Sequence, residues 1–200
     1  MARQIYSFHP TTSFLQVNYS EIYVADFSER TKMLPIKRSV EITDHNQLAP
    51  DGRTLMDSAV IHNDGGLLLE FSLLHDDLYT STIVPNNLHC EGCFYLENNA
   101  NRKWIVFFEL KDCLPKNISK HKGKAKKQIE NVVLDFKGHS LINGLNLFGI
   151  ISCPRKKVAF NDTIVGDMFA ARAYKRRTGI TLYGTNEVLV INENNIRPVI

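Results

Sequence analysis

The strongest constraint on the fold is a change of hydrophobic period in the middle of the chain. Residues 104–111, WIVFFELK, are rich in the β-branched and aromatic residues that favour a strand. After Pro115 the apolar residues recur with a helical period, at Ala125, Ile129, Val132, Val133 and Phe136. Residues 147–153, LFGIISC, return to the pattern of a buried strand. Because a helix between two strands is the crossover that a parallel pair requires, the sequence predicts a mixed α/β sheet.

Shorter apolar runs precede this unit. Residues 67–72 follow an Asp-Gly-Gly turn, and residues 93–96 are separated from the run at 104 by an Asn-rich segment at 98–101. Two β-rich runs joined by a short Asn-rich segment predict a hairpin.

Two helices complete the expected order. The first has Asn117 or Ser119 as its N-cap and Gly138 at its end, and the second is expected over 163–177, ending near Gly179. Strands are then expected at 180–183 and 187–191. The expected fold class is therefore α/β, a mixed central β-sheet flanked by helices.

The chain shows no linker that would separate two domains, so we expect one domain over residues 1–200. Residues 66–192 form its expected core, and residues 1–65 are an N-terminal extension of uncertain structure. The runs at 14–17 and 22–24 are too short for periodicity to distinguish strand from helix. Two roles for the extension stay open: a dimerisation element, which would make the protein a homodimer, or a helical opening of the fold.

Charge is divided unevenly along the chain. The net charge is +3, but residues 1–100 carry six Lys/Arg and thirteen Asp/Glu, whereas residues 101–200 carry eighteen and eight. Such asymmetry favours an anionic partner. No run approaches the roughly 18 apolar residues of a membrane span, and the first ten residues lack a secretory pattern. We therefore expect a cytoplasmic protein without a membrane partner, whose four cysteines are thiols or ligands.

The run at 104–111 ends in a charged pair. Alternate strand residues share a face, so Glu109 and Lys111 point the same way, about 7 Å apart. A carboxylate is a hard oxygen ligand for Mg²⁺, and a neighbouring lysine can orient a water or offset charge on a phosphate. The alternative is that the strand emerges into solvent there and the pair is a surface salt bridge.

The chain resembles the restriction-endonuclease-like, or PD-(D/E)xK, nuclease superfamily. Its FFELKD segment at 107–112 and KAKKQI at 124–129 are similar to small bacterial members, in which a strand ending in ELK leads to a helix with a Lys-Ala-x-x-Gln pattern. The resemblance covers about residues 66–192 and implies a strand-strand-strand-helix-strand core. It also implies that Glu109 is a metal ligand, that Lys111 is the catalytic lysine, and that Gln128 is a polar helix residue facing the site.

One position departs from the family's pattern. Cys93 stands where the family has its main metal-binding Asp, and a thiol is a poor Mg²⁺ ligand. Glu91, two residues earlier on the same strand face, is the substitute that we favour. Poorer candidates are Glu97, Asp77 and Glu70. Either Glu91 takes over as the second ligand or the protein has lost catalysis.

Basic residues follow the expected site in three clusters. The third cluster is residues 175–177, and the first two contain the residues that we expect to bind a nucleic-acid backbone: Lys120, Lys124, Lys127, Arg155, Lys156 and Lys157. For the helix lysines, a solvated outer face is the alternative interpretation.

The sequence is therefore compatible with three functions from different classes. The first is a Mg²⁺-dependent nuclease that acts on DNA more than on RNA. The second keeps the fold without catalysis, as a module that binds nucleic acid or a protein. The third is a small zinc-stabilised protein, with zinc held by Cys90, Cys93 and Cys113 together with His89 or His121.

Overall fold

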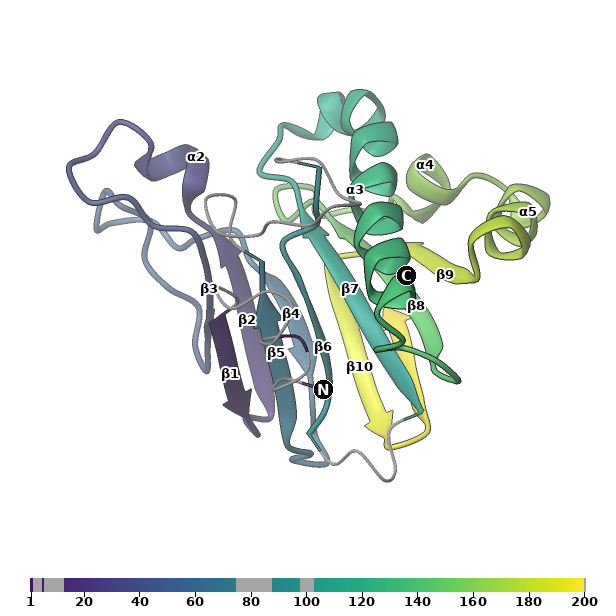
Figure 1. The fold of residues 1–200 in the computed structure, drawn as a ribbon. Helices are drawn as coiled ribbons and strands as arrows, with labels where there is room; N and C mark the ends of the chain where they lie inside the picture. The colour runs from purple at the N-terminus through teal and green to yellow at the C-terminus, as the bar shows by residue number, and fades with distance from the viewer. Residues whose placement is uncertain (2–4, 6–12, 75–87, 98–102, 200) are drawn as a thin grey trace.

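The chain forms two mixed β-sheets and a layer of helices (Figure 1). This computed structural model describes residues 1, 5, 13–74, 88–97 and 103–199. Within these residues, the larger sheet, called sheet A, has the order β1-β5-β6-β7-β8-β9. Its strands are β1 (Ser13–Val17), β5 (Leu69–Leu73), β6 (Gly92–Leu96), β7 (Trp104–Leu110), β8 (Asn146–Ser152) and β9 (Ile180–Gly184).

Sheet A combines both kinds of pairing. β5, β6 and β7 form an antiparallel meander, which confirms the hairpin predicted between the runs at 93 and 104. β7, β8 and β9 are parallel, with Glu109 opposite Ile151 in the register. The prediction of a mixed α/β sheet is confirmed.

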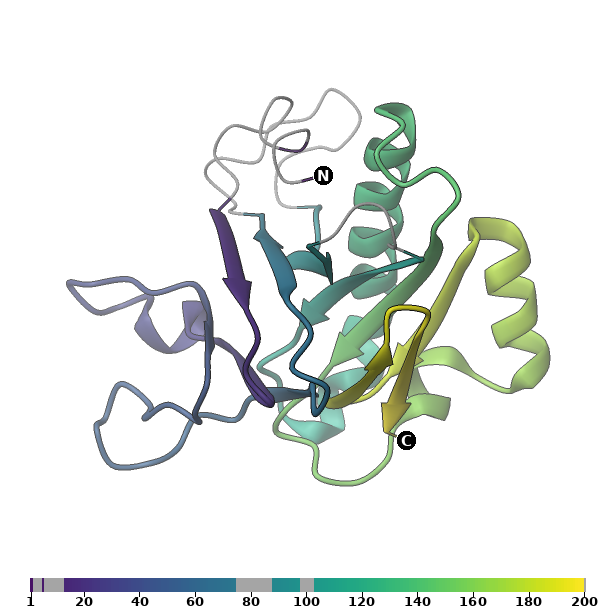
Figure 2. The same ribbon diagram turned by 90° about the horizontal axis from the view of Figure 1, so that it is seen from below.

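The second sheet, sheet B, joins strands from residues 21–62 with the last strands of the chain (Figure 2). In the described residues its order is β11-β10-β4-β2-β3. Its strands are β2 (Glu21–Asp26), β3 (Val40–Thr43), β4 (Ala59–His62), β10 (Glu187–Asn192) and β11 (Asn195–Val199). The two short runs that the sequence left open are thus strands: residues 14–17 lie in β1 and residues 22–24 in β2.

The long helix α3 (Ile118–Gly138) connects the parallel strands β7 and β8 and packs on sheet A. It follows a short 3₁₀ turn, η2 (Pro115–Asn117), and its N-cap Asn117 makes no side-chain capping hydrogen bond. The helix ends at Gly138, as the sequence predicts, and this glycine is its last helical residue. The C-cap is His139, and Ser140 adopts a positive φ of 58°.

The prediction of one helix over 163–177 is wrong. The segment forms two helices, α4 (Asn161–Val165) and α5 (Met168–Thr178). Gly166, at φ 90°, ends the first, and the Asp167 side chain caps the second by accepting the Ala170 N–H at 2.8 Å. Another short helix, α2 (Ser28–Thr31), follows β2. None of the helices in the described ranges has the length and hydrophobicity to cross a membrane.

β7 divides the protein into two cores because its side chains alternate between the faces of sheet A. Trp104, Val106, Phe108 and Leu110 pack between the two sheets. Ile105 and Phe107 point to the other face and pack with α3. Glu109 lies on the same face of β7 as Phe107, so the Glu109 carboxylate faces the helix layer.

Candidate functional site

Glu109 and Lys111 form an ion pair at the carboxyl end of β7. The Glu109 side chain is completely buried, and only 16% of the Lys111 side chain is exposed. The pair is therefore not the surface salt bridge that the sequence left as an alternative. An ion pair removed from water is energetically demanding, since each charge loses its hydration.

The surroundings shift the pKa values of both groups. Burial raises the pKa of Glu109 to about 7, although the Lys111 ammonium and the nearby backbone N–H of Glu91 act in the opposite direction. Burial also opposes the charge of Lys111, but the Glu109 carboxylate outweighs it and the pKa of the ammonium is raised. Each charge is thus held in the interior by its partner, against the cost of burial.

Gln128 connects this pair to α3. The Lys111 ammonium donates a hydrogen bond to Gln128 Oε1 at 3.1 Å, and Gln128 Nε2 donates to the His89 carbonyl at 2.7 Å. The amide is buried and bonded at both ends, so it fixes the direction of the Lys111 side chain. The structure thus brings together the three residues that the sequence proposed as catalytic.

Two further carboxylates act electrostatically on Lys111. Glu91 directly precedes β6, and the pairing of Gly92 with Phe108 places it across from Glu109. Asp26, the last residue of β2, influences both members of the pair from sheet B. The sequence singled out Glu91 but missed Asp26, because nothing in a local pattern brings the end of β2 to the end of β7.

The other acidic candidates are placed elsewhere. Glu70 is buried beside Tyr95, which donates to its carboxylate, and it also accepts from Gln16 at 3.2 Å. Glu97 follows the opposite end of β6 and is exposed. Asp77 lies outside the described residues. Among the candidates that the structure describes, Glu91 is the one that lies beside Glu109.

Cys93 is fully buried within sheet A, between Ser72 of β5 and Phe107 of β7 in the strand register. Cys113 lies beside Cys153, with which its side chain interacts. Across the described ranges, no three His, Cys, Asp or Glu side chains converge as a metal site. The composite zinc site expected from the sequence is therefore not formed by these residues.

The basic residues fall into two groups. Lys120, Lys124 and Lys127 are exposed along α3. Arg155 and Lys157 instead form ion pairs, Arg155 with Asp112 at 3.6 Å and Lys157 with Asp57 at 2.9 Å. The positive charge available to a phosphate is therefore greater on α3 than on the segment after β8.

Arg30 of α2 links these ion pairs. It lies 3.2 Å from both Asp57 and Asp112, and Asp112 directly follows Lys111. No local sequence pattern indicates this chain of charges, which joins α2 to the end of β7. Lys156 lies apart from it and lines a cavity of about 490 Å³ between sheet B and the segment after β8.

Gly92 sets the close approach of β5 and β6 beside the site. A Cβ atom there would lie 2.4 Å from the Ser72 carbonyl oxygen and 3.1 Å from the Phe108 ring. We expect Gly92→Ala to lower the free energy of unfolding by about 2–3 kcal/mol, the usual range for overpacking, in urea denaturation. Gly123→Ala on α3 is the control: nothing lies within 4 Å, and about 0.5–1 kcal/mol of stabilisation is expected. Equal effects of the two variants would contradict this account.

Comparisons with protein-family models, curated proteins and solved structures found no match. The site itself consists of a buried carboxylate–ammonium pair at the end of a central strand, and an amide from the crossover helix orients the lysine of that pair.

Proposed function

We propose that this protein is a metal-dependent nuclease of the restriction-endonuclease-like class, which hydrolyses phosphodiester bonds in DNA rather than RNA. The observation that carries the proposal is the buried Glu109–Lys111 pair with Gln128 bonded to its lysine. The order β5, β6, β7, α3, β8 supports it, because this is the strand-strand-strand-helix-strand order that the resemblance implies. The preference for DNA rests on the resemblance.

The residues at the end of β7 fit a hard cation such as Mg²⁺. Apart from the Lys111 contact, neither oxygen of the buried Glu109 carboxylate accepts a hydrogen bond of ordinary length and angle from a described residue. Mg²⁺ is commonly held by one or two carboxylates together with waters and substrate phosphates. Glu109 would be one ligand, with Glu91 or Asp26 as the second.

The roles of the side chains follow from their positions. When bound, Mg²⁺ supplies Lewis-acid activation of the phosphodiester and lowers the pKa of a coordinated water. Lys111 would position the attacking water and offset the charge that develops on the phosphate. Gln128 would hold Lys111 in that direction, and the exposed α3 lysines 120, 124 and 127 would bind the backbone beyond the scissile bond.

Binding of the cation can be tested without cleavage. At about 100 times its Kd, Mn²⁺ is expected to raise the melting temperature of the wild-type protein by about 5–10 °C. Glu109→Gln is expected to remove this shift, because it removes the ligand charge. Comparing Glu91→Gln with Asp26→Asn identifies the second ligand as the one whose replacement also removes the shift. Differential scanning fluorimetry over a Mn²⁺ and Mg²⁺ series provides the measurement.

Glu70→Gln is the matched control, since Glu70 is a buried carboxylate on the same face of sheet A. This variant is expected to keep the metal-dependent shift, whatever its own melting temperature. The proposed metal role would be contradicted if the melting temperature of the wild-type protein did not change in about 10 mM Mg²⁺ or Mn²⁺. This is about the highest concentration worth testing for a functional Mg²⁺ site.

Cys93 favours a second candidate function. The side chain in the position of the family's main acidic ligand is a buried thiol, and this is the pattern expected of a nuclease fold that has lost catalysis. Such a module would bind nucleic acid or a protein partner without cutting. It predicts salt-dependent DNA binding and no cleavage in Mg²⁺ or Mn²⁺, and specific cleavage that disappears with Lys111→Ala would contradict it.

A further inference from the structure

Helix α5 buries less of its surface than a helix in a packed domain usually does. None of its eleven residues is buried, whereas a surface helix normally buries an apolar stripe. In Figures 1 and 2 it stands out from the body of the protein beside β9. Ala171 and Tyr174 are the partly buried residues by which it contacts the core under α3. A helix of this kind presents most of its surface to solvent or to a partner.

The exposed surface of α5 is strongly positive. Residues 168–178 contain four Lys/Arg and no Asp/Glu. The four are exposed, and three of them, Lys175, Arg176 and Arg177, occupy the last turn. Cations there are favoured by the helix dipole, so the charge stabilises the helix while remaining available to an anion.

Arg177 attaches α5 to α3. Its guanidinium donates two hydrogen bonds to the Glu130 carboxylate, at 2.8 and 3.2 Å, and lies 5.2 Å from the centre of the Tyr174 ring. Lys126 of α3 approaches the same ring at 5.6 Å. The two helices are therefore held together at a defined place, and their outer surfaces adjoin.

The adjoining part of α3 is also basic. Residues 116–127 contain six lysines and no acidic residue. Burial lowers the pKa of Lys126, and the neighbouring charges of Lys122 and Arg177 add to this effect, although the Glu130 carboxylate opposes it. Like charges that crowd one another in this way destabilise the free protein, and a bound polyanion would relieve the repulsion.

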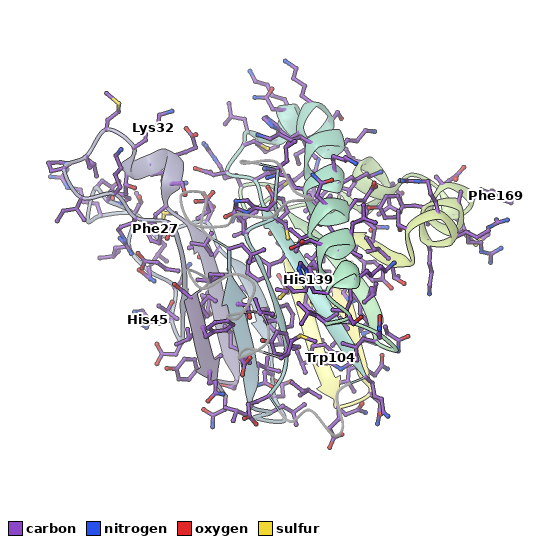
Figure 3. The ribbon with its side chains drawn as sticks, in the orientation of Figure 1. Phe27, Lys32, His45, Trp104, His139 and Phe169 are labelled. Carbon is purple, nitrogen blue, oxygen red and sulfur yellow. The ribbon has the colours of Figure 1, made fainter. Side chains whose placement is uncertain are left out.

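We propose that Lys122, Lys126, Arg172, Lys175 and Arg176, here called the α3–α5 surface, bind the phosphate backbone of the nucleic acid. This inference rests on the proposed function, which makes a nucleic acid the substrate. Glu130 is paired with Arg177, so these five cations give the surface a net positive charge that suits the negative charge of a backbone, and phosphate contacts give affinity without sequence selection. The apolar side chains of α5, Met168 and Phe169, lie at its beginning, and Figure 3 shows Phe169 at the outer edge of the molecule.

The test uses a fluorescein-labelled 24-base-pair DNA duplex in EDTA, with fluorescence anisotropy measured across a NaCl series. The triple variant Arg172→Ala/Lys175→Ala/Arg176→Ala is expected to bind about 10- to 100-fold more weakly at 100 mM-range salt. The slope of log Kd against log salt is expected to fall by about 2–3, because each lost phosphate contact contributes about 0.9. Arg177 is left in place so that α5 keeps its attachment.

Lys32→Ala/Lys37→Ala/Arg53→Ala is the matched control, because it removes three exposed cations near α2, away from α5. It is expected to keep wild-type affinity and slope. Wild-type affinity in the α5 triple variant, or no binding by the wild type, would overturn the inference. A loss caused instead by Met168→Ala/Phe169→Ala, with the cations intact, would also overturn it, because it would place the contact with DNA on the apolar start of α5 and not on its cations.

The same measurements separate this inference from the nuclease proposal. Binding that depends on the α5 cations in a protein that never cleaves in Mg²⁺ or Mn²⁺ would keep the α3–α5 surface and contradict the nuclease. Cleavage that depends on Glu109, combined with wild-type binding by the α5 triple variant, would keep the nuclease and contradict the α3–α5 surface.

Discussion

Lys111→Met is expected to lower the free energy of unfolding by about 2–3 kcal/mol at pH 9, because it leaves the Glu109 carboxylate buried without its counter-charge. Methionine keeps most of the length of lysine, so the effect reports the lost charge more than a lost volume. Urea denaturation followed by circular dichroism gives the free energy.

The effect of Lys111→Met should depend on pH. The folded-state pKa of Glu109 is already raised to about 7 in the wild type, and it rises further when the lysine is removed. A raised folded pKa gives stability that is present at low pH and is lost as the pH rises through that value. The two proteins should therefore differ little at pH 5–6, where Glu109 is neutral in both, and diverge above pH 7.

Glu109→Met/Lys111→Met is expected to be as stable as the wild type or more stable, by up to about 4 kcal/mol, because two apolar side chains avoid the loss of hydration. Lys116→Met, on an exposed lysine nearby, is the control and should change stability by less than about 0.5 kcal/mol. A double variant less stable than Lys111→Met would contradict this account of the pair.

Local periodicity predicted the strands and the helix whose type is set by residues close together in the sequence. The strand at 104, the helix after Pro115 and the strand at 147 each carry enough apolar residues to fix their type. Glu109, Lys111 and Gln128 lie on these elements. The alternation of side chains along a strand predicted that Glu109 and Lys111 share a face, whereas the position of Gln128 toward the site was implied by the family resemblance.

The missed features depend on contacts between distant segments. Sheet B pairs β4 with β10, and no short-range pattern specifies that pairing. Asp26 reaches the site only because β2 ends beside the end of β7. The break between α4 and α5 had a local signal, since Gly166 followed by Asp167 is a helix stop and a helix cap. The helical period of the surrounding residues concealed that signal.

Glu109→Gln and Lys111→Ala are each expected to lower the rate of DNA cleavage by about 10²–10⁴-fold under saturating Mg²⁺. The first removes the charge that would bind the cation, and the second removes the group that would position the attacking water. Because the two groups act as a unit, the double variant should be scarcely slower than either single variant. Single-turnover cleavage of a labelled duplex measures these rates.

Two substitutions of Gln128 distinguish a role in positioning Lys111 from a purely structural role. Gln128→Glu keeps an acceptor for Lys111 but loses the donor to the His89 carbonyl, whereas Gln128→Met loses both. If the amide acts by directing Lys111, the glutamate variant should keep more activity than the methionine variant, and the pH dependence of the rate should move. Equal losses with an unchanged pH profile would indicate a purely structural role.

The wild-type protein decides between the two candidate functions. Duplex DNA that is bound yet left intact in both Mg²⁺ and Mn²⁺ would contradict the nuclease proposal and favour the binding module. The stability experiment bears on the same choice, because a buried ion pair that stabilises the fold less than two methionines has no structural advantage over apolar residues. A stabilised Glu109→Met/Lys111→Met variant that also loses cleavage would therefore show that the pair serves the reaction at the expense of the fold.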